Sequence, residues 1–178
     1  MSITTLSTRE IYRNRWITLR EDRIRHDSGT EGIYSVVSKP DFALIIPRVD
    51  NDFYLVEQYR YPVKARHMEF PQGTWEENAA ATPEMVAVRE LQEETGLSAR
   101  KMTYLGPLYL AYGLMDQRMH TFLAEELTQG KAAPAPEEGD LTCQRVAIKD
   151  FEAGILDGRI VDSCSVAAYG LLRLRGLL

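Results

Sequence analysis

Three glutamates lie close together in the stretch Arg89 to Leu97, which reads Arg-Glu-Leu-Gln-Glu-Glu-Thr-Gly-Leu. Each residue of a helix turns by about 100°, so Glu90, Glu93 and Glu94 share one helical face. Like charges at these spacings destabilise an isolated helix by roughly 0.2 to 0.5 kcal/mol per pair, and the negative end of the helix dipole adds to that cost. A bound cation would offset it. Hard divalent ions such as Mg²⁺ take oxygen ligands of this kind.

The alternative to a metal site is a solvated helix face on which Arg89 forms an ion pair with Glu93. The preceding residues favour the metal site. The run Glu69 to Gly73 predicts a strand end followed by a glycine that permits close backbone approach, and only a loop separates it from the helix. We therefore expect the carboxylates of Glu93 and Glu94 to face an ion and solvent rather than the core.

The helix that carries these acids has clear sequence limits. Thr82 is the expected N-cap, Pro83 the first helical residue and Gly96 the stop. Its apolar residues, which we expect on a neighbouring face, are Ala87, Val88 and Leu91.

Short β-rich runs surround this helix and turn formers separate them. Hairpin turns are expected at Asp27-Ser28-Gly29 and Asp50-Asn51-Asp52, and an exposed loop at Gln129 to Gly139. Strands on both sides of one central helix in the sequence, with helices at the end, indicate an α+β or layered α/β/α domain. The expected strands are Trp16–Leu19, Ile33–Val37, Phe42–Ile46, Phe53–Val56, Met102–Leu110 and Met119–Ala124, and the expected late helices are Ile148–Leu156 and Ser163–Leu174 with Asp162 as N-cap and Gly176 as stop.

Length and composition limit the classes of protein. A chain of 178 residues predicts one domain, and its net charge of −5 disfavours broad nucleic-acid binding. Cys143 and Cys164 are too few for a disulfide framework and fit a reducing, cytoplasmic location. No run of residues is apolar enough to suggest a membrane span or a signal peptide. We expect a cytoplasmic protein with no nucleic-acid or membrane partner.

The run Gly73 to Leu97 resembles the Nudix box, whose pattern is G-x5-E-x7-R-E-U-x-E-E-x-G-U with U an aliphatic residue. The second half matches at every specified position. The first half departs from the pattern, because Gly73 precedes Arg89 by 16 positions instead of 14 and the first box glutamate falls at Ala81. Glu76 or Glu77 could replace that glutamate only if the longer loop folds back.

The resemblance implies a Nudix fold, an α/β/α layered mixed sheet. It also implies hydrolysis of a nucleoside diphosphate linked to another moiety, with Mg²⁺ or Mn²⁺ as cofactor. By position in the motif, the implied metal ligands are Glu90, Glu93, Glu94 and the carbonyl of Gln72, next to the box glycine Gly73. Arg89 would hold Glu93 by a charge-assisted bond.

Outside the box, the chain is similar to the ADP-ribose pyrophosphatase branch from about Asn14 to Ala124. Gln58-Tyr59-Arg60 resembles a motif whose arginine contacts the diphosphate. Glu69 to Gly73 resembles the branch's Glu-Phe-Pro-Ala-Gly. Arg15 to Leu19 resembles an N-terminal strand whose tryptophan, here Trp16, stacks on adenine. The implied substrate-binding residues are Arg60, Trp16 and Gly73.

The sequence leaves alternatives for the general base that activates water. Branch members often carry a glutamate where this chain has Gln117, and a glutamine cannot take a proton at neutral pH. Either a box glutamate, for which we choose Glu93, or Asp116 activates water, or the substrate and mechanism differ.

The sequence therefore predicts a metal-dependent pyrophosphohydrolase that splits ADP-ribose or a related nucleoside diphosphate sugar into a nucleoside monophosphate and a sugar phosphate. The alternatives are a hydrolase of another nucleoside diphosphate-linked substrate and a non-hydrolysing nucleotide sensor. We expect one Nudix domain over residues 1–178, with an antiparallel N-terminal arm over about 1–40 and a catalytic core over about 41–178. A homodimer formed through the arm is also expected.

Overall fold

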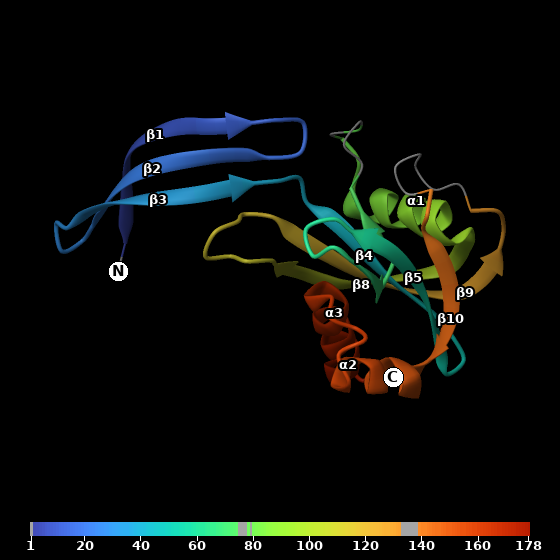
Figure 1. Ribbon diagram of the computed structural model, residues 1–178. Coiled ribbons are helices and arrows are strands. Elements are labelled where there is room, and N and C mark those ends of the chain that lie inside the picture. Colours follow the sequence, from blue (N-terminus) through green and yellow to red (C-terminus); the bar gives the residue numbers. More distant parts are fainter. Residues whose placement is uncertain (1, 75–77, 79, 133–138) are drawn as a thin grey trace. The chain divides into compact units, whose positions relative to one another are not determined.

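The computed structural model (Figure 1) describes residues 2–74, 78, 80–132 and 139–178. Its contacts divide the chain into two compact units. The first comprises the residues up to Asp41 together with Tyr109–Arg118, and the second comprises Phe42–Leu108 and Met119–Leu178. Within the described residues, no helix is both long and apolar enough to cross a membrane.

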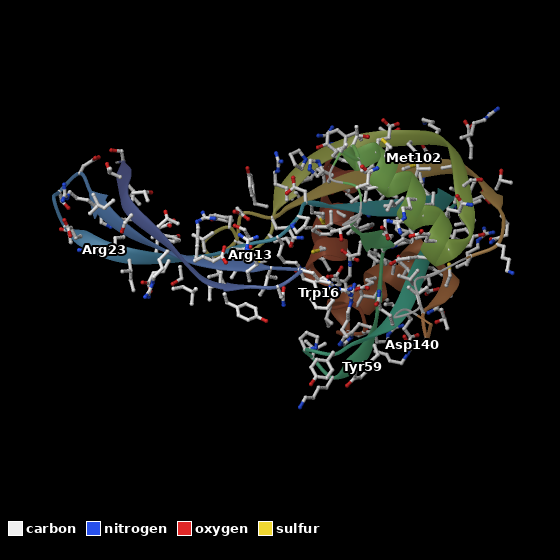
Figure 2. The ribbon with its side chains drawn as sticks, turned by 90° about the horizontal axis from the view of Figure 1, so that it is seen from above. Arg13, Trp16, Arg23, Tyr59, Met102 and Asp140 are labelled. Carbon is white, nitrogen blue, oxygen red and sulfur yellow. The ribbon has the colours of Figure 1, made fainter. Side chains whose placement is uncertain are left out.

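The first unit is built on a three-stranded antiparallel sheet in the order β1-β2-β3. The expected turn at Asp27-Ser28-Gly29 is confirmed, and Gly29 takes the left-handed conformation with φ 86°. Side chains project from both faces of the sheet, those of Arg13 and Arg23 among them (Figure 2). The strands are β1 (Ile3–Arg13), β2 (Thr18–His26) and β3 (Glu31–Ser38).

Two features of this sheet differ from our expectation. The strand expected at Trp16–Leu19 begins at Thr18 and continues to His26. β1 lies in the expected N-terminal arm, but it extends through a polar segment for which we named no individual strand, and all its residues are exposed. A strand that buries neither face has no apolar alternation to reveal it, so the usual sequence signal is missing.

The second unit is a mixed sheet in the order β10-β5-β4-β9-β8, with β6 paired to β5 and β7 to β4. β4 and β9 run parallel, whereas β4 pairs antiparallel with β5 and β7. The strands are β4 (Phe42–Val49), β5 (Asp52–Arg60), β6 (Ala65–Glu69), β7 (Gln72–Gly73), β8 (Leu97–Tyr109), β9 (Arg118–Gln129) and β10 (Thr142–Ala147).

Helices cover both faces of this sheet (Figure 1). α1 (Pro83–Thr95) packs on one face, and α2 (Ile148–Leu156) and α3 (Ser163–Leu174) lie on the other. The layered α+β architecture is therefore confirmed. The core under α1 contains Ala43, Ile45, Ala87, Leu91, Phe122 and Ala124, and an aromatic cluster on the opposite face contains Phe53, Phe70, Phe151 and Tyr169.

The predicted limits of α1 are confirmed. The Thr82 hydroxyl accepts a hydrogen bond from the Met85 N–H at 3.3 Å, and Pro83 begins the helix. Gly96 ends it in the left-handed conformation with φ 71°. One expectation was wrong: Val88 is half exposed, because it lies outside the stripe that Ala87 and Leu91 bury.

We expect Gly96→Ala to destabilise the protein more than Gly176→Ala. Both glycines have positive φ, 71° and 65°, which costs an alanine about 1 to 2 kcal/mol. A Cβ at residue 96 would also lie 2.6 Å from the Ala132 backbone nitrogen, whereas nothing lies within 4 Å of one at residue 176. Chemical denaturation should give a free energy of unfolding lower by at least about 1 kcal/mol in Gly96→Ala than in Gly176→Ala. Equal losses would contradict the close approach.

Candidate functional site

The three box glutamates lie on α1 but differ in burial. Glu90 is 6% exposed and Glu94 is 1% exposed, while the Glu93 side chain keeps 29% of its surface open. We expected Glu93 and Glu94 to face an ion and solvent, and the exposure to solvent was wrong for Glu94. The exposure of a helical residue depends on the element that packs against its face of the helix. Here that element is β7, which follows Pro71.

β7 lies directly against these buried carboxylates. The Gln72 N–H donates to Oε2 of Glu94 at 3.1 Å. A Cβ added to Gly73 would lie 2.4 Å from Oε2 of Glu90, so only glycine leaves room for the carboxylate in this position. β7 is itself fixed by pairing with β4, where Gly73 lies opposite Ala43. The predicted close approach of the backbone at Gly73 is thus present.

The oxygen atoms of β7 and α1 at this contact are of the kind that a hard divalent cation binds. Carboxylates and a backbone carbonyl are its preferred ligands, and Gly73 keeps open the space beside Glu90 that a side chain would fill. In the described part of the chain, no three His, Cys, Asp or Glu side chains are already arranged at metal-binding spacing. The candidate ligands Glu90, Glu93 and Glu94 thus agree in type and helical face but require side-chain adjustment to converge on an ion.

Arg89 and Glu93 form the expected ion pair on α1. The Arg89 Nε donates to Oε1 of Glu93 at 2.8 Å, and both side chains are about one-third exposed. The pair holds the most accessible of the three carboxylates in one orientation.

A second charged group on β5 and β6 involves Arg60. Its guanidinium contacts both carboxylate oxygens of Glu69, with Nε at 3.2 Å from Oε2. Gln58 donates to the same carboxylate at 2.9 Å. Glu69 is buried, and burial raises the pKa of its carboxyl while the Arg60 guanidinium opposes that rise. Our sequence reasoning did not identify this pairing, because it depends on the register between two strands.

Trp16 lies in the first unit, in a turn that fixes its backbone. The Asn14 side-chain oxygen accepts hydrogen bonds from the N–H groups of Trp16 and Ile17, both at 2.9 Å. The Arg15 guanidinium lies 4.0 Å from the centre of the indole ring, a cation–π distance. The ring remains 48% exposed.

The open question of the general base concerns Gln117 and Asp116, which also belong to the first unit. Gln117 is buried and its amide donates to the Pro40 carbonyl at 2.6 Å. Asp116 accepts from the Ser38 hydroxyl at 2.6 Å and lies 3.5 Å from an Arg20 nitrogen. Gln117 therefore has a structural contact where branch members often carry a base.

The two acids that could compensate for Ala81 lie outside the described residues, namely Glu76 and Glu77. Ala81 itself is half buried and packs against the core under α1. Its methyl group thus serves packing at this position.

Comparisons with known proteins match almost the whole chain. A family model described as "NUDIX domain" matches residues 38–162, and one described as "Nucleoside diphosphate sugar hydrolase N-terminal domain" matches residues 3–37. The ADP-ribose pyrophosphatase of Bacillus subtilis is 31% identical, covering 98% of this chain and 94% of that protein. The methanol dehydrogenase activator of Bacillus methanolicus is 28% identical with the same coverage. A crystal structure of an ADP compounds hydrolase matches with a TM-score of 0.87 at 22% identity, covering 99% of this chain and 96% of that one.

We expect Glu69 and Glu125 to give opposite pH dependences of stability. The pKa of Glu69 is raised by burial. Its contribution to the free energy of unfolding is therefore complete below the pKa of about 4.5 in the unfolded chain, and it is lost as pH rises through the folded pKa. The pKa of Glu125 is lowered, chiefly by a hydrogen bond from Lys101, so its contribution is present above the unfolded value and lost as pH falls.

Denaturation of Glu69→Gln, Glu125→Gln and the unmodified protein between pH 4 and 7 measures both effects. The stability advantage of the unmodified protein over Glu69→Gln should fall as pH rises, and its advantage over Glu125→Gln should grow. Slopes of the same sign would contradict the assignment.

Proposed function

Since the chain belongs to the NUDIX domain family, we propose that it hydrolyses the diphosphate bond of ADP-ribose or a related nucleoside diphosphate sugar, releasing a nucleoside monophosphate and a sugar phosphate. The chain is a Nudix hydrolase. Residues 3–37 match a model of the nucleoside diphosphate sugar hydrolase N-terminal domain, and the Bacillus subtilis relative is an ADP-ribose pyrophosphatase. The observation that carries the proposal is the packing of Gln72 and Gly73 against the buried carboxylates of α1.

Magnesium or manganese is the proposed cofactor. Glu90, Glu93, Glu94 and the Gln72 carbonyl would hold it, and when bound it would neutralise the diphosphate and lower the pKa of a water molecule. The Gln72 N–H contributes by orienting Glu94.

Glu93 is the proposed base, because it is the most exposed of the three box glutamates and Arg89 fixes its orientation. Asp116 remains the alternative base, although its carboxylate is occupied by Ser38. Arg60 is the proposed diphosphate contact: its side chain is 41% exposed, so part of the guanidinium is available while Glu69 holds the rest.

Two other functions remain as alternatives, a hydrolase of a different nucleoside diphosphate-linked substrate and a nucleotide sensor without hydrolysis. A sensor would have no need of three acids on one helix, since their mutual repulsion is a cost that binding alone does not require. We also propose a cytoplasmic location, which is supported by two free cysteines.

We expect Mg²⁺- or Mn²⁺-dependent hydrolysis of a diphosphate panel, measured as phosphate release with a coupled phosphatase. Glu93→Gln should lower kcat by about 10² to 10⁴, the usual loss for a positioned acid or base. Glu84→Gln is the matched control, because Glu84 is an exposed acid in the first turn of the same helix. Ligand binding without turnover in either metal would favour the sensor, and a Glu93→Gln variant within threefold of the unmodified enzyme would refute the assignment of Glu93.

A homodimer through the first unit is the proposed assembly, with Trp16 contributing to the partner's substrate pocket. Its sheet exposes large apolar side chains, including Ile33 at 65%, Tyr12 at 53% and Ile3 at 52%. A second copy covering them would remove that surface from water and protect the edge strands.

Light scattering should therefore give about twice the chain mass of 20.2 kDa. Trp16→Ala should raise KM more than it lowers kcat, because stacking on a base contributes roughly 1 to 3 kcal/mol to binding. Trp16→Phe retains an aromatic face and should recover most of the loss. A monomer at micromolar concentration, or an unchanged KM, would contradict the respective half of the proposal.

A further inference from the structure

The first turn of α3 is joined to the segment Glu69–Gly73 by one buried hydroxyl. Ser165 is fully buried, and its Oγ accepts a hydrogen bond from the Phe70 N–H at 2.9 Å. The same hydroxyl donates to Oδ2 of Asp162 at 2.7 Å. The Ser165 hydroxyl thus accepts a hydrogen bond from a buried backbone N–H and donates one to a carboxylate. These two contacts fix the orientation of the hydroxyl.

Asp162 has two tasks at this position. As N-cap of α3, it accepts hydrogen bonds from the N–H groups of Ser165 at 2.8 Å and Cys164 at 3.3 Å. Its Oδ2 also accepts from the side-chain amide of Gln72 at 3.4 Å. A cap requires only the first set of contacts. The contacts with the Gln72 amide and the Ser165 hydroxyl additionally connect the Asp162 carboxylate to the segment between β6 and α1.

The other side of the segment meets the α1 carboxylates. The Gln72 N–H donates to Glu94, and Gly73 lies against Glu90. The Pro71 carbonyl accepts from the Ile45 N–H at 2.9 Å, which ties the centre of the segment to β4. The side chain of Gln72 therefore contacts Asp162 at the start of α3, and its backbone N–H contacts Glu94 on α1.

We infer that Asp162 and Ser165 are positioning residues of the site, and that α3 sets where Gln72 and Gly73 meet Glu94 and Glu90. This inference rests on the proposed function. The matched part of the NUDIX model ends at residue 162, which is the N-cap of α3. Partners one contact removed from metal ligands commonly change metal affinity or activity by 10- to 100-fold when they are replaced.

The test uses the full-length protein and three variants. Ser165→Ala removes the acceptor of the Phe70 N–H. Asp162→Asn keeps a good capping residue but replaces one acceptor oxygen with a donor. Arg173→Gln is the matched control, because Arg173 lies in the last turn of α3 and contacts Glu152 and Tyr169 at the opposite end of the helix.

The first measurement is hydrogen exchange at the Phe70 and Gln72 amides, which requires no turnover. Ser165→Ala should speed exchange at Phe70 at least tenfold, whereas Arg173→Gln should change it less than twofold. The second measurement is Mn²⁺ affinity by electron paramagnetic resonance, together with kcat and KM. Both Ser165→Ala and Asp162→Asn should weaken Mn²⁺ binding and lower kcat about tenfold, with KM within about twofold. If Ser165→Ala does not fold, Asp162→Asn decides the outcome by itself.

Three results would overturn the inference: unchanged exchange at Phe70 in Ser165→Ala, unchanged Mn²⁺ affinity in Asp162→Asn, or an equal effect of Arg173→Gln, which would show general loosening of α3. An unmodified protein that hydrolyses no diphosphate would refute the proposed function alone, because the exchange and Mn²⁺ measurements still decide the role of α3.

Discussion

The close approach of β7 to α1 is the contact on which the site depends. A backbone can lie this near a carboxylate only where no side chain intervenes, and Gly73 supplies that space beside Glu90. The adjacent Gln72 N–H donates to Oε2 of Glu94, a residue that is almost completely buried. Burial of a carboxylate without such a hydrogen bond would carry a large desolvation cost. The buried charge on α1 therefore depends on the position of the Gln72 backbone.

The same requirement extends outward through the second unit. Glu69 begins the segment that leads to β7, and it is buried in contact with Arg60 and Gln58. Phe70 follows it into the aromatic cluster under α2 and α3. The segment therefore combines polar contacts to both α1 and α3 with apolar packing of the Phe70 ring. Such an arrangement restricts the segment more than either kind of contact would by itself.

The first unit has a different balance of forces. Its three strands bury few apolar side chains, Ile24 among them, and much of its apolar surface remains exposed. Contacts with residues 109–118 add to its stability. Val37 forms a parallel bridge with Met115, and the Tyr34 hydroxyl donates to the Gly113 carbonyl at 2.9 Å. A sheet with so little core is typical of a segment completed by another surface.

The sequence by itself determined the features that depend on neighbours within about four residues. The cap at Thr82, the stop at Gly96, the cap at Asp162 and the Arg89–Glu93 pair are all interactions of this kind, and each is present. Only the tertiary structure decided the burial of Glu90 and Glu94, the pairing of Arg60 with Glu69 and the contact between Phe70 and Ser165. The last of these joins residues 95 positions apart, and such a contact exists only after the sheet has brought both elements together. Helical periodicity places a side chain on a face, but the element that packs against that face determines whether the side chain meets solvent, a strand or an ion.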